Sequence, residues 1–161
     1  MSRTQKLGVL FLSLLLSAGL FYWLKPAETR VANLQFTTIA GETLSLHALR
    51  GKPVLVTFWA SDCHVCLEEI PDLIKLHQQQ SLTIIAVAMP YDPPHRVMAI
   101  ATDMQLPYAV ALDPGAEISN AFGEVKFTPN SFLIDPQGRV IMQKTGRLDM
   151  SVLQAHLLNM V

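Results

Sequence analysis

The sequence predicts an α/β domain with a mixed central sheet flanked by helices on both faces, preceded by one transmembrane helix. Three observations support this prediction. An uncharged, apolar segment occupies residues 7–24, and the β-rich apolar run VLVTFW follows at 54–59. A turn sequence, DPQG at 135–138, then separates two short strand-like segments. The apolar segment predicts the transmembrane helix, and the apolar run at 54–59 predicts a buried parallel strand. The turn predicts that the two segments beside it form an antiparallel pair.

Composition limits the class of protein. The 161 residues are 50% hydrophobic and 16% charged, which excludes a disordered chain. The formal net charge of -1 argues against a nucleic-acid partner, since such proteins normally carry a basic excess. Only two cysteines are present, so a scaffold held together by many disulfides is excluded.

Residues 7–24 predict a signal-anchor. As a helix they would be about 27 Å long, close to the roughly 30 Å hydrocarbon core of a bilayer. Arg3 and Lys6 precede the segment, which places residues 1–6 in the cytoplasm and the remainder across the membrane. A cleaved signal peptide and a buried core helix are the alternatives, although a signal peptide has a shorter apolar region.

A short polar linker, residues 25–32, should join this anchor to one domain at 33–161. The domain should begin with a hairpin whose strands are Phe36–Ile39 and Thr43–Leu46. A strand, a helix and a second strand should follow as a βαβ unit, at Val54–Trp59, Cys63–Gln79 and Leu82–Met89. The helix should bury an apolar stripe that consists of Val65, Ile70, Leu73, Ile74 and Leu76.

The second half of the domain should start after a proline-rich loop, Tyr91–Pro94. The expected elements are a helix at His95–Met104, a strand at Tyr108–Leu112, a helix at Ala116–Phe122 and a hairpin of Ser131–Ile134 with Arg139–Lys144. Asp149 can cap a last helix. The apolar face of that helix would contain Val152, Leu153, Leu157 and Met160.

Both cysteines lie in one C-x-x-C motif, Cys63 and Cys66, between the buried strand and its helix. Side chains three residues apart in a first helical turn can form a disulfide. The amino terminus of the helix favours a thiolate there. This arrangement is the minimum that thiol–disulfide exchange requires. A structural disulfide, a zinc site and a Cu(I) site remain alternatives, but zinc usually needs four ligands.

The wider motif resembles a known family. VTFWASDCHVC at 56–66, Pro71 and FTPNSFLIDPQG at 127–138 resemble the TlpA/ResA/CcmG-type membrane-anchored thiol–disulfide oxidoreductases of bacteria. The resemblance covers about residues 36–161 and implies a thioredoxin fold, with an αβ insertion at about 92–122. The residues predict the α/β class, and the resemblance specifies a family within that class.

The resemblance also implies roles for individual residues. Cys63 would attack the disulfide of a client protein, and Cys66 would resolve the mixed disulfide. Trp59, Thr128 and Pro129 would form the substrate-binding part of the site, with Pro129 in the cis form. These assignments require no cofactor other than the redox-active Cys63–Cys66 disulfide, and no metal.

Glu69 matches the active-site glutamate of the ResA-like branch. Thr57 occupies the position where thioredoxins keep a buried acid, so Glu69 is expected to be partly buried and to assist proton movement at Cys66. The alternative is an exposed carboxylate in the first helical turn, favoured there by the helix dipole.

Two residues depart from the family pattern, Asp62 before the first cysteine and His64 between the cysteines. Both are expected to tune the redox potential, and they leave the direction of electron flow open. The resemblance favours reduction of client disulfides, with a membrane thiol-reductant transporter as electron donor and apocytochrome c among the clients. The protein would then reside in the bacterial inner membrane with its catalytic domain in the periplasm or otherwise outside the cytoplasm. A copper-delivery module and a disulfide oxidase or isomerase are the alternatives.

Overall fold

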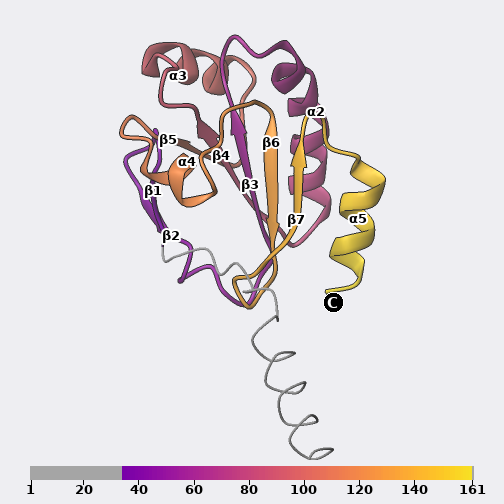
Figure 1. Cartoon of the computed structure of the whole chain (residues 1–161). Helices are drawn as coiled ribbons and strands as arrows, with labels where there is room; N and C mark the ends of the chain where they lie inside the picture. Colours follow the sequence, from indigo (N-terminus) through magenta and orange to yellow (C-terminus); the bar gives the residue numbers. More distant parts are fainter. Residues whose placement is uncertain (1–33, 161) are drawn as a thin grey trace, which may run out of the picture.

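A five-stranded mixed sheet runs through the centre of the protein in the order β5-β4-β3-β6-β7 (Figure 1). The computed structural model describes residues 34–160. The elements are β1 (Gln35–Thr37), β2 (Thr43–Ser45), β3 (Val54–Trp59), α2 (His64–Gln79), β4 (Thr83–Ala88), α3 (Pro94–Asp103), β5 (Ala109–Leu112), α4 (Glu117–Ala121), β6 (Asn130–Ile134), β7 (Val140–Thr145) and α5 (Met150–Leu158).

Strand β3 is the central strand of the sheet. All six of its residues are buried, as expected for a continuous apolar run rich in β-branched and aromatic residues. It pairs in parallel with β4 and antiparallel with β6. The carboxyl ends of β3 and β4 therefore lie at the same edge as the amino end of β6, and the loops at this edge form the candidate site.

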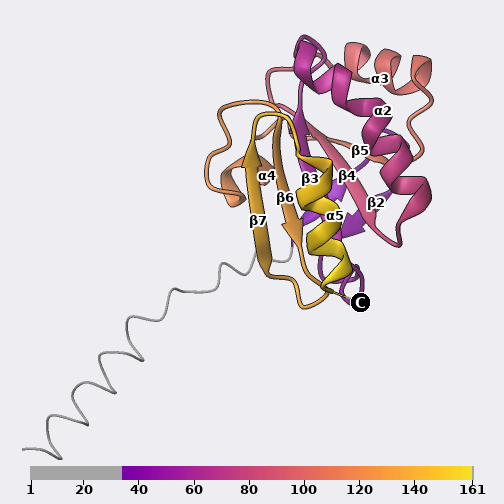
Figure 2. The ribbon, with the colours of Figure 1, turned by 90° about the vertical axis from the view of Figure 1, so that its right-hand side faces the viewer.

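Each face of the sheet has its own apolar core. One core joins the sheet to α2, α3 and α5 through residues such as Leu73, Val97 and Leu153. The other includes Phe36 of the β1–β2 hairpin and Phe122, which follows α4. Figure 2 looks onto the face covered by α2 and α5. Because both faces are covered, the strands of the interior are apolar on both sides.

The α/β fold with a mixed sheet and helices on both faces is confirmed. Every expected element of the domain is present, with most bounds within one or two residues of those predicted. Two apolar positions were assigned wrongly to buried helix faces. Val65, in the first turn of α2, is 40% exposed. Val152 is also exposed, and α5 buries only Leu153 and Leu157.

The predicted anchor at 7–24 and linker at 25–32 lie outside the described residues. Among the helices of residues 34–160, none is both long enough and apolar enough to cross a membrane.

Candidate active site

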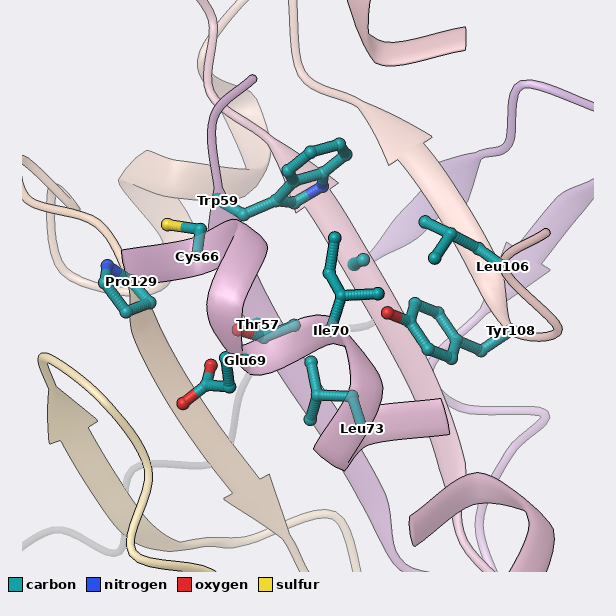
Figure 3. Close-up of a pocket in the computed structure, with 10 residues that line it drawn as sticks. Thr57, Trp59, Cys66, Glu69, Ile70, Leu73, Leu106, Tyr108 and Pro129 are labelled. Atoms are coloured by element: carbon teal, nitrogen blue, oxygen red, sulfur yellow. The ribbon is translucent and has the colours of Figure 1, made fainter. Parts of the chain in front are cut away.

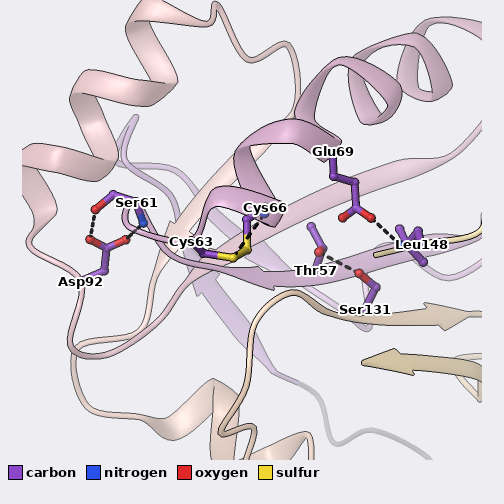
Figure 4. Close-up of a disulfide and its surroundings, with 8 residues drawn as sticks. All are labelled: Thr57, Ser61, Cys63, Cys66, Glu69, Asp92, Ser131 and Leu148. Carbon is purple, nitrogen blue, oxygen red and sulfur yellow. Dashed lines mark hydrogen bonds between the residues drawn. A yellow bond between two sulfur atoms is a disulfide. The ribbon is translucent and has the colours of Figure 1, made fainter. Parts of the chain in front are cut away.

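A disulfide between Cys63 and Cys66 lies where β3 gives way to α2 (Figure 4). The two Cα atoms are 5.2 Å apart, within the usual range for a disulfide. Cys63 is the N-cap of α2, so its sulfur accepts a hydrogen bond from the Cys66 backbone N–H at 3.2 Å. A reduced Cys63 would keep this N–H and the positive end of the helix close to its sulfur, and both favour the thiolate.

The two cysteines differ in burial. Cys66 is only 3% exposed and belongs to the core beneath α2, whereas Cys63 is half-buried and contacts both cores from the edge. A partner's sulfur can therefore reach Cys63 far more easily than Cys66. The difference follows from position, since Cys66 lies one turn into the helix on its sheet-facing side.

The loop before Cys63 is held by Asp92, which is only 6% exposed. One carboxylate oxygen of Asp92 accepts the Ser61 backbone N–H, and the other accepts the Ser61 hydroxyl, both at 2.6 Å. Asp92 follows β4 in the Tyr91–Pro94 loop, so two loops of the site are joined by charge-assisted hydrogen bonds. No pattern in the sequence marks Asp92 or Ser61 as a residue of the site.

The Thr128–Pro129 peptide bond is cis, as the resemblance implies. Pro129 is buried and lines a cavity together with Cys66, whereas Thr128 is half-buried. Phe127, immediately before this pair, is 72% exposed. The sequence did not single out this exposed aromatic side chain next to the cis-proline pair, although it belongs to the motif that carries the resemblance.

The cavity behind Cys66 has a volume of about 10 Å³, close to the smallest that can hold one water molecule. Figure 3 shows Cys66 between Trp59 and Pro129 at one end of it. Trp59 is buried, and its indole Nε1 has no hydrogen-bond acceptor within the described part of the chain. The lining consists of Thr57, Trp59, Cys66, Glu69, Ile70, Leu73, Ala86, Leu106, Tyr108 and Pro129.

Glu69 lies on this cavity and is only 1% exposed. Its Oε1 atom accepts the backbone N–H of Leu148 at 2.5 Å. Burial raises the pKa of Glu69 above its ordinary value of 4.5, although the Leu148 N–H and the positive charge of Arg147 oppose that rise. The carboxylate is thus more deeply buried than expected, and an exposed position in the first turn is wrong.

Thr57 and Ser131 form a second buried polar contact at the cavity. Their hydroxyl oxygens are 2.8 Å apart, and the two residues are direct partners on β3 and β6. Neither hydroxyl can act as an acid near neutral pH, so Glu69 is the carboxylic acid that lines the cavity.

The remaining predicted residues lie at the surface. Asp62 is exposed, and His64 places its Nε2 atom 3.1 Å from Glu68, one turn further along α2. Within residues 34–160, no three His, Cys, Asp or Glu side chains come close enough together to hold a metal ion. The geometry therefore provides an accessible sulfur, a buried sulfur and a buried acid, which together suit thiol–disulfide exchange.

Comparison with known proteins gives one family and several relatives. The redoxin family matches residues 26–157. The chain is 30% identical over 128 residues to the thiol-disulfide oxidoreductase ResA of Bacillus thuringiensis subsp. konkukian, covering 78% of this chain and 73% of that protein. It is 29% identical over 126 residues to ResA of Halalkalibacterium halodurans, covering 76% and 70%.

A solved structure is also similar to this chain. A Neisseria meningitidis protein assigned as a thioredoxin superimposes with a TM-score of 0.75 at 29% sequence identity. The match covers 83% of this chain and 89% of that one.

Proposed function

The chain belongs to the redoxin family, and on that premise we propose that it is a membrane-anchored reductase of disulfides in proteins outside the cytoplasm. The family and the ResA relatives establish a thiol–disulfide oxidoreductase of the TlpA/ResA/CcmG type.

The reaction begins with the reduced pair. The Cys63 thiolate attacks one sulfur of a client disulfide, a mixed disulfide forms, and the other client sulfur leaves as a thiolate. Cys66 then gives its proton to Glu69 and attacks the Cys63 sulfur. The bond between Cys63 and the client breaks, and the second client thiolate leaves with the electron pair. The client has gained two electrons and the Cys63–Cys66 disulfide has formed.

The observation that supports this best is the unequal burial of the two sulfurs beside one buried acid. Cys63 is open to a partner, while Cys66 is enclosed with Glu69 and Pro129 around the same cavity. This arrangement supports attack by Cys63 and resolution by Cys66. A disulfide with a merely structural role would not need a buried carboxylic acid on the cavity that one of its cysteines lines.

The anchor and compartment rest on the sequence of residues 7–24 and on the chemistry of the site. Disulfides persist outside the cytoplasm, so a reductase there needs a supply of electrons from the membrane. We therefore expect a membrane thiol-reductant transporter to regenerate the pair. Apocytochrome c, whose cysteines must be reduced before haem attachment, is the candidate client.

A trapping experiment tests the proposed function. A Cys66→Ser variant should accumulate mixed disulfides with clients on a non-reducing gel of membrane fractions, because resolution is blocked. The matched Cys63→Ser variant should accumulate far fewer, since its remaining sulfur is buried. Equal adducts from both variants, or none from either, would contradict the assignment.

The direction of electron flow needs a second measurement. The reduction potential of the Cys63–Cys66 pair should lie near that of thioredoxin, about -270 mV. A value near that of DsbA, about -120 mV, would make the protein an oxidase.

A further inference from the structure

The short segment between β7 and α5 contacts the redox site at two points through its backbone. The Gly146 N–H donates to the carbonyl oxygen of Pro129 at 2.8 Å, and the Leu148 N–H donates to Glu69 Oε1 at 2.5 Å. Residues 146–148 therefore connect the cis-proline loop to the buried acid of α2. Gly146 has a φ of +86°, a conformation that strains any residue with a side chain.

Arg147, the residue between these two contacts, extends along the outside of α2. Its Nη1 atom lies 3.7 Å from Glu68 and its Nη2 atom 3.4 Å from Asp72. Glu68 and Asp72 are positions -1 and +3 relative to Glu69, so the guanidinium lies beside the helical turn that carries the acid. Glu69 thus receives a hydrogen bond from one residue of the segment and the field of a positive charge from its neighbour.

Within residues 34–160, charged and titratable groups from several elements lie around Glu69. They are Cys66, Glu68 and Asp72 of α2, Tyr108 next to β5, and Arg147 of the segment. Burial has the largest effect on the pKa of Glu69 and raises it, and the hydrogen bond from the Leu148 N–H lowers it. The charge of Arg147 lowers this pKa further, whereas the charge of Asp72 raises it. Burial and the Glu69 charge raise the pKa of Tyr108, so its hydroxyl stays neutral near pH 7.

We propose that Arg147 is a positioning residue of the redox site, which sets through Glu69 the pH at which Cys66 reacts. The inference rests on the proposed function, because it needs Glu69 to accept the proton of Cys66. That proton moves to the Glu69 carboxylate as the sulfur of Cys66 bonds to Cys63 and the leaving sulfur takes the electron pair. A carboxylate must be ionised to accept it, and the guanidinium favours the ionised form.

Stopped-flow reaction of the reduced full-length protein with 5,5′-dithiobis-(2-nitrobenzoate) tests this role of Arg147. The first release of thionitrobenzoate reports attack by Cys63, and the second reports resolution by Cys66, so one trace contains its own control. In an Arg147→Gln variant, the acid limb of the second phase should move to higher pH. On that limb the rate should fall about 2- to 5-fold, the range that an exposed ion pair provides.

Two further variants test the sign. Arg147→Lys keeps the charge and should behave like the wild type, whereas Asp72→Asn should move the limb to lower pH. High salt should shrink both shifts, because exposed charges are screened. Thermal melting of each variant checks that the domain is folded.

The outcomes separate the two proposals. If Glu69→Gln abolishes the acid limb but Arg147→Gln leaves it in place, the role of Arg147 is overturned and the proposed function stands. The role is also overturned if Arg147→Lys shifts the limb as Arg147→Gln does, or if Arg147→Gln still shifts it in a Glu69→Gln background. If Glu69→Gln itself leaves the limb unchanged, the proton-accepting role in the proposed function fails.

Discussion

Asp92 accepts both hydrogen bonds that Ser61 donates, one from its backbone N–H and one from its hydroxyl, at 2.6 Å each. Ser61 lies two residues before Cys63, and the Cys63 N–H in turn donates to Ala60 at 3.1 Å. The loop that leads into the redox pair is therefore held on both sides of Ser61.

Replacing Asp92 by Ala should lower the free energy of unfolding by about 2–4 kcal/mol, because it leaves a backbone donor and a hydroxyl without their charged acceptor. Guanidinium unfolding of the oxidised domain would measure this. Asp103→Ala, at the exposed end of α3, is the matched control and should change stability by less than about 0.5 kcal/mol. Equal effects of the two substitutions would mean that the Ser61 contacts contribute little.

The buried Thr57–Ser131 contact should behave as a coupled pair. Ser131→Ala alone should destabilise the domain by about 1–3 kcal/mol, because the Thr57 hydroxyl would remain buried without its partner. Adding Thr57→Val removes that unsatisfied group, so the double variant should lose less stability than the sum of the single variants. A double-mutant cycle from urea unfolding checks this, and strictly additive effects would contradict it.

Glu69 should make the stability of the wild type depend on pH. Its pKa in the folded protein is raised above the ordinary 4.5 of the unfolded chain, so its favourable contribution is complete below pH 4.5 and is lost as pH rises through the folded pKa. Each unit of that rise corresponds to about 1.4 kcal/mol. A Glu69→Gln variant keeps an acceptor for the Leu148 N–H but does not titrate.

The difference in free energy of unfolding between wild type and Glu69→Gln should therefore be constant below pH 4.5. Above that pH it should move in favour of the variant, until Glu69 is ionised in the folded protein as well. Unfolding curves at a series of pH values would show this. A difference that stays constant, or that moves in favour of the wild type, would mean that Glu69 is not destabilised by burial.

Gln105 offers a stabilising substitution. It follows α3 with a φ of +50°, and the next residue, Leu106, donates its N–H to Ala101 at 3.0 Å, which closes the helix as in a Schellman motif. Gln105→Gly should relieve the strain of the left-handed conformation and raise the free energy of unfolding by about 1 kcal/mol. The melting temperature should rise accordingly. Gln105→Ala keeps the strain and is the control. The same melting temperature for both variants would show that the strain is small.

The parts of the fold predicted best are those with a strong local pattern. Strand β3 was predicted with its observed bounds because all six of its residues are apolar or β-branched and are buried from both sides. The start of α2 was predicted within one residue, at Cys63, which the structure shows to be the N-cap. Helical periodicity alone was less reliable at Val65, because the first turn of α2 does not bury that side of the helix.

The contacts that complete the site depend on residues far apart in the chain. Glu69 and Leu148 are 79 residues apart, and Ser61 and Asp92 are 31 apart. No local pattern marks a carboxylate that is buried for its hydrogen bonds, because charged residues normally indicate a surface position. The resemblance identified Glu69, but it assigned nothing to Asp92, Arg147 or Leu148.

The hydrogen bonds from Ser61 to Asp92 bear on the proposed reduction of client proteins. Asp92 holds the loop that leads into Cys63, and the Cys63 sulfur accepts a hydrogen bond at the amino end of α2, so this sulfur has little freedom to move toward a target. The client disulfide must therefore adopt the geometry that the attack requires. A disulfide in a mobile segment can do so with less local unfolding than a disulfide inside a folded core. If the proposed function holds, unfolded client chains should therefore be reduced faster than folded ones.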